Sequence, residues 1–503
     1  MLANILGKGW SAVSVYLFVP LYLQFLGLET YGVVGLYALM QVVLFFADGG
    51  LTAAMSREMA ALSAMPESHK ERPDLLRTIE LLYLGIVVAL AGSIALAAEV
   101  IARHWLNAAT VPQPVLVSSI RMMGIALALQ FQASLYQGGL MGLQQQVLGN
   151  GLQAAAGLIR AGGAVVVLAC VSPTLEAFFL WHLIANLVYC VACRVALWRS
   201  LTCRIDGAVS PQFRWPLLHR ILPYAAGMMG ITLVSSLLTQ ADKLLVSKLF
   251  SLEEFACYSL AGAISQIPVM LTLPIVSAVF PRLTSLASYG DRAGLSTLYH
   301  RACQMVSVGT IPLGLIVICF PHDILYVWTQ STVVAEKTAL VAQLLAAGYL
   351  LQALLMLPYN LALAHGWTRL NLMIGVASIC VVVPMLFVFM SRFGLVGGPL
   401  VWFGWNVLVT PIFLVLLHRK LLPGELWKWC REDVGMPLAA ALPVVLLGRC
   451  FLPLGTGRIS TILALGLLFV VSMAVAGLSV TGPARLLSRV RRFGRGFRVS
   501  VNQ

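Results

Sequence analysis

Charged residues are scarce in this chain. Only 10% of its 503 residues are Asp, Glu, Lys or Arg, whereas 60% are hydrophobic, and the mean hydropathy is +0.90. Acidic residues are scarcer than basic ones, with 19 Asp and Glu against 33 Lys and Arg. In soluble domains about a quarter of the residues are charged. The composition therefore excludes an ordinary soluble protein and places the chain in a membrane.

Catalytic signatures are also missing. The sequence holds no Gly-rich phosphate loop followed by Lys and Ser or Thr, no nucleophile elbow and no metalloprotease helix. Most of the ten cysteines lie in apolar runs, where Cys behaves as a small buried hydrophobe. Cys190 and Cys193 lie one helical turn apart without His or further Cys nearby, which favours packing over a zinc site. We therefore expect no enzyme, no ATP use, no cofactor and no metal site.

Long apolar runs dominate what is present. They are long enough, at roughly 18 residues or more, to cross a hydrocarbon core of about 30 Å as helices. The first run is too long for a cleaved signal peptide, and no small-residue cleavage site follows it. The sequence predicts an all-α polytopic membrane protein with about fourteen transmembrane helices. The expected spans are 3–27, 31–57, 78–100, 117–141, 148–170, 175–198, 219–249, 255–281, 299–321, 337–362, 369–391, 396–418, 435–453 and 459–481.

The placement of Lys and Arg predicts the orientation, because cytoplasmic loops hold an excess of positive charge. A cytoplasmic N-terminus puts about 24 of the basic residues inside, and the C-terminus then lies inside as well. The net charge of +14 is thus a topology signal and does not indicate nucleic-acid binding. Outer loops are short, at most roughly fifteen residues, which leaves no room for an external catalytic domain. The cytoplasmic clusters are Arg57 to Arg77, Arg194 to Arg220, Arg282 to Arg301, Arg419 to Arg431 and Arg485 to Arg498.

The chain also repeats itself at an interval of about 224 residues. Leu28-Glu29-Thr30-Tyr31 opens an apolar run that closes at Arg57, and Leu252-Glu253-Glu254-Phe255 opens another that closes at Arg282. Further along, Trp105 matches Trp328, Tyr136 matches Tyr359 and Asn150 matches Asn371. Six spans separate the copies, so both halves enter the membrane in the same direction and form parallel repeats, as in transporters. We expect a six-helix lobe at 1–200, a cytoplasmic linker at 201–218, a second six-helix lobe at 219–420, an extra C-terminal helical hairpin at 435–481 and a basic tail at 482–503.

Polar residues inside the spans fall on helical stripes. Ionisable groups at this depth are costly, so they usually mark a pathway or a watery cavity. A cleft between the lobes would explain the stripes. There are two alternatives: Ser and Thr could form hydrogen bonds between helices, or Asp48 could form a structural pair with Arg57. The stripes comprise Asn4, Lys8 and Ser11 on the first span, Tyr37, Gln41 and Asp48 on the second, and Thr232, Ser235, Ser236, Thr239 and Lys243 on the seventh.

Arg160 lies near the middle of the fifth span, where an arginine costs at least about 2.5–3.5 kcal/mol. It either contributes to an anion-attracting cavity or forms a buried pair with Glu80, Asp48 or Asp242. A desolvated carboxylate or imidazole can also titrate or bind a cation. Four side chains are candidates for such ion coupling: Asp48, Asp242, Glu80 and His182.

Several segments resemble the polysaccharide transporters of the O-antigen flippase type, which belong to the multidrug/oligosaccharidyl-lipid/polysaccharide exporter superfamily. The resemblance covers roughly the first twelve spans. It rests on Phe18-Val19-Pro20-Leu21-Tyr22-Leu23, Leu26-Gly27-Leu28-Glu29-Thr30-Tyr31-Gly32, Ala47-Asp48-Gly49-Gly50-Leu51 to Arg57, Gln240-Ala241-Asp242-Lys243, Tyr258-Ser259-Leu260-Ala261 and Pro281-Arg282-Leu283.

The resemblance implies a flippase that moves an undecaprenyl-diphosphate-linked oligosaccharide from the cytoplasmic to the periplasmic leaflet of the bacterial inner membrane. Two lobes would alternate their access, coupled to protons or other cations through residues such as Asp48 and Asp242. The implied partners are the lipid-linked oligosaccharide, membrane lipids, and polysaccharide polymerase and chain-length proteins, with the chain acting as a monomer. The diphosphate would cross through a cationic cavity formed by Lys8, Arg57, Arg160, Lys243, Lys248 and Arg282.

Two other classes compete with this interpretation. A multidrug-type small-molecule or cation antiporter would need the same two lobes, but it would favour an acidic, aromatic cavity. The basic side chains expected here count against it. A membrane glycosyltransferase or repeat-unit polymerase would carry its catalytic residues on a sizeable polar loop, and the short outer loops count against that class.

Overall fold

The computed structural model describes residues 17–48, 50–64, 71–202, 211–452 and 457–481. The stripe of Asn4, Lys8 and Ser11 and the basic tail lie outside the described residues, as do the side chains of Ser235 and Ser236. In the described part of the chain every named element is a helix, and ten helices are long and apolar enough to cross a membrane. The prediction of an all-helical polytopic protein is confirmed, whereas the count of about fourteen spans stays a prediction.

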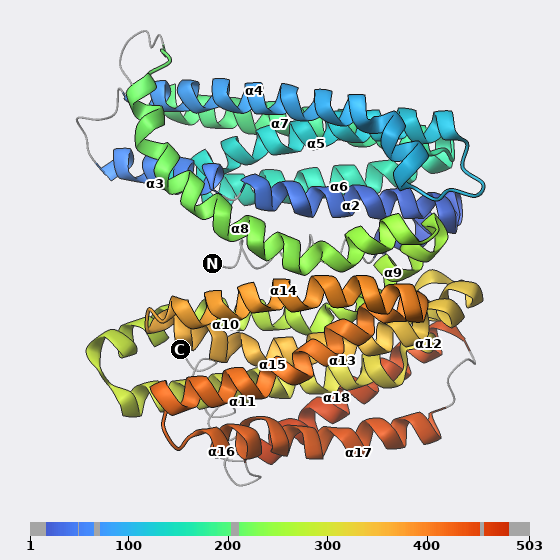
Figure 1. Ribbon diagram of the computed structural model, residues 1–503, viewed down its shortest axis with the longest axis vertical. Coiled ribbons are helices and arrows are strands. Elements are labelled where there is room, and N and C mark those ends of the chain that lie inside the picture. Colours follow the sequence, from blue (N-terminus) through green and yellow to red (C-terminus); the bar gives the residue numbers. More distant parts are fainter. Residues whose placement is uncertain (1–16, 49, 65–70, 203–210, 453–456, 482–503) are drawn as a thin grey trace, which may run out of the picture. The chain divides into compact units, whose positions relative to one another are not determined.

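The chain divides into two compact units, Met1–Cys257 and Tyr258–Gln503. The division falls inside α9, beyond the linker expected at 201–218, because α8 packs against α2 and α3 of unit 1. The assignment of residues 1–200 and 219–420 to two lobes stays a prediction. Unit 1 comprises α2 (Leu28–Asp48), α3 (Leu51–Ala64), α4 (Glu71–Val100), the π-helix η2 (Ile101–Trp105), α5 (Gln113–Gly142), α6 (Gln146–Cys170), α7 (Leu175–Thr202), α8 (Trp215–Leu249) and the start of α9 (Leu252–Ser265) (Figure 1).

Helix α5 occupies the middle of unit 1, where it packs against α3, α4 and α7. The core beneath these helices includes the fully buried side chains of Met55, Met59 and Tyr83. Gly142 lets α5 approach α3 closely, since a Cβ atom at this position would lie 2.5 Å from the carbonyl oxygen of Ser56. This close packing holds the residues that precede and follow the start of α3 in fixed positions.

The second expected span, 31–57, is not one continuous helix. α2 ends at Asp48 and α3 begins at Leu51. Gly50 stands at the break, and a Cβ atom there would lie only 2.0 Å from the carbonyl oxygen of Ala225 on α8. The expected span 255–281 is likewise divided, into α9 and α10, with Pro268 in the first turn of α10. Both copies of the sequence repeat therefore contain an interrupted helix.

Unit 2 is organised around α11, which packs against α10, α13, α17 and α18. Its large buried side chains include Tyr299 and Phe320. The C-terminal helical pair α17 and α18 packs internally and against α11, which attaches the predicted hairpin to this unit. The helices of unit 2 are the rest of α9, then α10 (Ile267–Tyr289), α11 (Arg292–Cys319), α12 (Pro321–Thr329), α13 (Thr332–Ala364), α14 (Thr368–Phe393), the 3-10 helix η3 (Gly394–Val396), α15 (Gly397–Leu421), α16 (Leu426–Lys428), the π-helix η4 (Trp429–Gly435), α17 (Met436–Phe451) and α18 (Arg458–Thr481).

A buried polar cluster lies where the C-terminal pair joins α11. The ring of His300 is hydrogen-bonded through Nε2 to Oε2 of Glu425 at 2.5 Å and through Nδ1 to a carboxylate of η4, that of Asp433. Gln304 Nε2 donates to Oδ1 of Asp433 at 2.9 Å, and Ser296 Oγ donates to Oε1 of Glu425 at 2.8 Å. A His300 ring with a proton on each nitrogen would donate to both carboxylates at once.

Candidate functional site

The carboxylate of Asp48 is buried at the end of α2, with 4% of the residue exposed. Its Oδ2 accepts hydrogen bonds from Thr52 Oγ1 at 2.5 Å and from Ser134 Oγ at 2.8 Å. Its Oδ1 accepts a third from the hydroxyl of Tyr83. The hydroxyl of Thr52 also lies 3.2 Å from those of Tyr83 and Ser134, so the three donors form one connected group.

Each of these donors comes from a different helix. Thr52 is in the first turn of α3, one helical turn beyond Asp48, while Tyr83 is on α4 and Ser134 is on α5. Thr52 follows Asp48 by four residues, about one helical turn, and the packing of α5 on α3 and α4 adds the other two donors. All three are neutral hydroxyls, which can donate to a carboxylate or turn their own lone pairs toward a cation.

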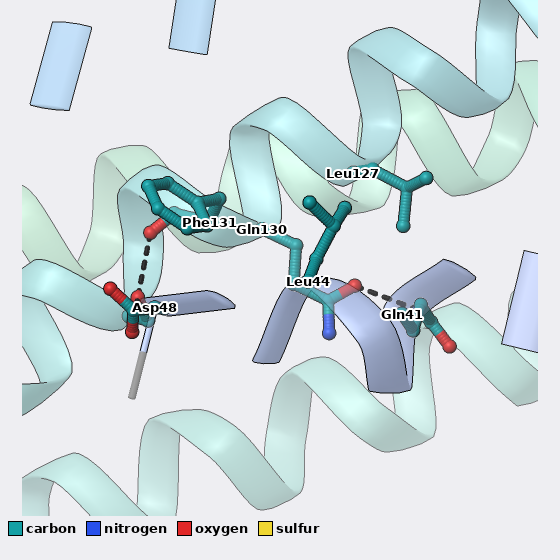
Figure 2. Close-up of a pocket in the computed structure, with 7 residues that line it drawn as sticks. Gln41, Leu44, Asp48, Leu127, Gln130 and Phe131 are labelled. Atoms are coloured by element: carbon teal, nitrogen blue, oxygen red, sulfur yellow. Dashed lines mark hydrogen bonds between the residues drawn. The ribbon is translucent and has the colours of Figure 1, made fainter. Parts of the chain in front are cut away.

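A cavity of about 70 Å³ opens beside Asp48 (Figure 2). On its far side Gln41 Nε2 donates to Oε1 of Gln130 at 2.7 Å. A space of this size holds a few water molecules or a small cation, and it is too small for a sugar. The lining residues are Gln41, Leu44, Asp48, Leu127, Gln130, Phe131 and Ser134.

Arg160 on α6 is half-buried and lies inside the same unit. Its NH1 donates to Oδ1 of Asn186 at 3.1 Å, and its guanidinium lies 5.8 Å from the ring centre of Tyr189. Asn186 in turn donates to the hydroxyl of Tyr37 at 3.1 Å and to the carbonyl oxygen of Ala126 at 3.2 Å. The stripe predicted on the second span therefore reaches both Arg160, through Tyr37, and the cavity at Asp48.

The structure assigns different partners to two of the carboxylates that were expected near Arg160. Asp48 accepts from the three hydroxyls, and Glu80 accepts from Arg194 Nε at 2.6 Å and Arg77 NH1 at 3.2 Å. In the described contacts, the hydrogen bonds of Arg160 go to an amide oxygen and, at 3.4 Å, to the carbonyl oxygen of Ala156. Within the described contacts Arg160 forms no pair with Asp48 or Glu80, and its role in attracting an anion stays a prediction.

His182 is held by aromatic packing. Its ring centre lies 4.4 Å from that of Phe178 and 5.5 Å from that of Tyr37. Within the described residues neither ring nitrogen has a hydrogen-bond partner. A neutral imidazole among aromatic rings fits this environment better than a charged one.

The remaining predicted basic residues that the structure describes lie on different helices. Lys248 is at the end of α8, where its ammonium donates to the carbonyl of His104 and lies 5.5 Å from the ring centre of Trp105. Arg57 is exposed on α3, and Lys243 and Asp242 are half-buried on α8. Arg282 is exposed on α10 of unit 2. Within unit 1, Lys248 is therefore engaged with the segment after α4 and lies apart from the Arg160 group.

Sequence reasoning missed several partners in this site. Thr52 follows Asp48 by four residues, so helical spacing could have indicated it. Tyr83, Ser134 and Gln130 lie on other spans, and no local pattern links them to Asp48. The cluster of His300, Glu425 and Asp433 was also missed, since His300 lies more than a hundred residues before both carboxyl groups.

The comparisons with known proteins decide the family. A family model described as "Polysaccharide biosynthesis protein" matches residues 24–329. The chain belongs to this polysaccharide biosynthesis family. The family predicted from the sequence motifs is confirmed, and the apolar helices make the chain a multi-pass membrane protein.

One curated relative and two solved structures are similar to this family member. A Shigella flexneri protein named for O-antigen transport is 19% identical over 209 residues, and the match spans 42% of this chain and about half, 49%, of that relative. The lipid II flippase MurJ in an inward closed conformation matches with a TM-score of 0.73 at 12% identity, covering 95% of this chain and 98% of that one. An inward-facing multidrug resistance transporter of the MATE family matches with a TM-score of 0.66 at 15% identity, covering 84% and 95%. At these identities the two structures show the fold alone, which this chain shares with both transporters.

Proposed function

We propose that this protein is a flippase for an undecaprenyl-diphosphate-linked oligosaccharide, the repeat unit of an O-antigen or a related surface polysaccharide. It moves the lipid-linked sugar from the cytoplasmic to the periplasmic leaflet of the bacterial inner membrane by alternating access. Both termini lie in the cytoplasm. The observation that carries the proposal is the match of residues 24–329 to the polysaccharide biosynthesis family on a fold that it shares with a lipid II flippase.

The charges in unit 1 support an anionic substrate. The diphosphate of such a lipid is negatively charged and must cross a region of low dielectric constant. Arg160 is half-buried at the middle of α6, and its described partners are neutral, so its positive charge is available to attract an anion. We assign Arg160 to the substrate pathway, together with Lys8, Arg57, Lys243, Lys248 and Arg282.

The Asp48 site supports coupling to an ion. A single buried carboxylate with three hydroxyl groups can hold one proton or one monovalent cation, since it carries one charge and offers only oxygen ligands. The adjoining cavity of about 70 Å³ gives a small ion and water room to reach it. We assign the coupling role to Asp48, with Asp242 as the second candidate. Glu80 and His182 are weaker candidates, because Glu80 is paired with two arginines and His182 is packed among aromatic rings.

A multidrug-type antiporter is the competing function, and one observation bears on the choice. The match to MurJ covers 95% of this chain, whereas the match to the MATE transporter covers 84%. The fuller match supports a lipid-linked substrate. Polysaccharide polymerase and chain-length proteins are the partners we expect, with the flippase itself a monomer.

Leaflet-specific detection of the lipid-linked repeat unit tests the proposal. In cells that lack the gene, the intermediate should accumulate on the cytoplasmic side, and restoring the gene should return it to the periplasmic side. A matched strain that lacks only the polymerase controls for general accumulation. Periplasmic intermediate at the wild-type level in the deletion strain would refute the flippase function, and drug sensitivity without a change in polysaccharide would support the antiporter.

A further inference from the structure

Two arginines on the surface of unit 1 are held by one buried carboxylate. Glu80 on α4 is 5% exposed, and its Oε1 accepts from Arg194 Nε at 2.6 Å and from the hydroxyl of Tyr136 at 2.7 Å. Its Oε2 accepts from Arg77 NH1 at 3.2 Å. The side chains of Arg77 and Arg194 are 41% and 48% exposed, whereas that of Glu80 is 7% exposed. The carboxylate thus lies beneath the two guanidinium groups and fixes both of them.

Within the part of the chain that the structure describes, this group has a net positive charge and N–H donors that Glu80 does not use. Two guanidinium groups and one carboxylate sum to +1, because arginine is not deprotonated in proteins. Each guanidinium has five N–H donors, and Glu80 is bonded to only one nitrogen of each. The remaining N–H groups are held in place at no further entropic cost, which is the condition for tight binding of an oxyanion.

The surface around the arginines is apolar. On α7 the exposed hydrophobic side chains recur at helical spacing along one face, and Arg194 follows Leu187 by seven residues and Val191 by three, so it ends the same stripe. On α4, Leu81 and Leu84 lie four and seven residues beyond Arg77 and are exposed as well. A stripe of this kind faces lipid in a membrane protein. The exposed residues of the α7 stripe are Leu180, Ile184, Leu187, Val188, Val191 and Val195.

The depth of the arginines matches the headgroup region. At ~1.5 Å per residue, Arg77 lies about 35 Å from the far end of α4 at Val100. By the same measure Arg194 lies about 28 Å from the far end of α7 at Leu175. The hydrocarbon core is about 30 Å thick, so both arginines would lie near its boundary, where lipid headgroups begin. The excess of basic residues at this end of the unit predicts the cytoplasmic leaflet, where the anionic lipids attract them.

We propose that Arg77 and Arg194, positioned by Glu80, form a binding site for the phosphate of an anionic phospholipid in the cytoplasmic leaflet. The net charge of +1 matches the single negative charge of a phosphodiester such as that of phosphatidylglycerol. A polyprenyl diphosphate carries more charge than the site can neutralise. The exposed leucines and valines beside the arginines receive the acyl chains.

Native mass spectrometry of the full-length protein released from mixed phosphatidylglycerol and phosphatidylcholine vesicles tests this site. The wild type should retain one phosphatidylglycerol more than R77Q/E80Q/R194Q, and its affinity for that lipid should be on the order of tenfold higher. This triple variant removes the three charges together, so no buried carboxylate is left unpaired, and Gln at position 80 can still accept from Tyr136. The control is R103Q, which removes an arginine paired with Glu99 at the opposite end of the same helical stretch.

Thermal unfolding in phosphatidylcholine alone shows whether the triple variant is folded; if it unfolds below the assay temperature, R194Q alone is measured instead. Equal retention of phosphatidylglycerol by wild type and variant would overturn the proposal. Equal retention of phosphatidylcholine by the wild type would do so as well, since a zwitterionic headgroup has no net charge to match. Displacement of the retained lipid by equimolar undecaprenyl diphosphate would assign the site to the transported lipid and refute the phospholipid assignment.

Discussion

His300 and Asp433 form a hydrogen bond of 2.5 Å between α11 and the π-helix η4, with Asp433 fully buried. Removing the His300 ring leaves the buried carboxyl group of Asp433 without this hydrogen-bond partner. We expect His300→Phe to lower the free energy of unfolding by about 3–5 kcal/mol. Thermal unfolding of the purified protein in detergent measures this loss. The matched control is Asp323→Asn, which breaks the more exposed pair with Arg449 and should cost no more than about 1 kcal/mol. Equal losses in the two variants would show that the His300 cluster contributes no special stability.

Glu425, in the loop before α16, gives stability a dependence on pH. Burial raises the pKa of its carboxyl, but the hydrogen bonds from Ser296 and His300 outweigh burial and hold that pKa below its ordinary value of 4.5. Its contribution is therefore complete above the unfolded-state pKa and is lost as the pH falls through the lower folded-state pKa. We expect the melting temperature to fall between about pH 5 and pH 3. Melting curves of E425Q should show a shallower fall, whereas the exposed neighbour variant E432Q should follow the wild type.

Asp48→Asn should abolish ion-coupled transport while leaving the fold intact. Asn is isosteric with Asp and can hydrogen-bond to the same hydroxyls, but it carries no charge to bind or release a proton or a cation. Surface polysaccharide in a flippase-deletion strain, at matched expression, measures the effect, with and without a protonophore. Ser134→Ala removes one hydroxyl and keeps the carboxylate, so it should reduce transport by less than about tenfold. Full activity of D48N under both conditions would remove Asp48 from the coupling mechanism.

Arg160→Ala should strongly reduce the surface polysaccharide made by the same strain. The substitution deletes the half-buried cation of unit 1 whose described partners are neutral. Arg160→Lys keeps the charge and should retain part of the activity, which separates attraction of an anion from the specific bond to Asn186. Wild-type polysaccharide from R160A would mean that Arg160 is structural or idle.

Gly50→Ala should destabilise unit 1 through a clash with α8. The new Cβ atom would lie 2.0 Å from the carbonyl oxygen of Ala225, so one of the two backbones must move. We expect a loss of about 1–3 kcal/mol in the free energy of unfolding. Gly92→Ala is the control, since no atom lies within 4 Å of its Cβ position, and in mid-helix it should be neutral or stabilising by up to ~1 kcal/mol. Similar melting temperatures for the two variants would contradict the close packing at Gly50.

Hydropathy and periodicity were enough to predict the membrane class and the polar face of the second span, and the resemblance of several sequence motifs to a known family predicted the family. They identified Tyr37, Gln41 and Asp48 because residues on one helix face follow a fixed spacing. They could not identify Tyr83 or Ser134, whose place beside Asp48 depends on how α4 and α5 pack against α3. The sequence also did not predict the break after Asp48. The two glycines that follow fit a continuous helix that packs closely on a neighbour, and only the close approach of α8 to Gly50 indicates otherwise.

The pairing of Arg160 was open for a similar reason. A mid-span arginine must be satisfied, but its sequence neighbours do not show whether an amide or a carboxylate satisfies it. Only the packing of α6 on α7 places Asn186 beside it. Long-range polar partners are thus the part of this site that a single sequence specifies least.

Asp48 lies at the break between two helices, so its carboxylate connects helices through hydrogen bonds besides carrying a charge. The three hydroxyls that donate to it belong to α3, α4 and α5. If Asp48 has the coupling role proposed above, binding or release of one proton at this carboxylate would change the hydrogen bonds that hold these three helices together.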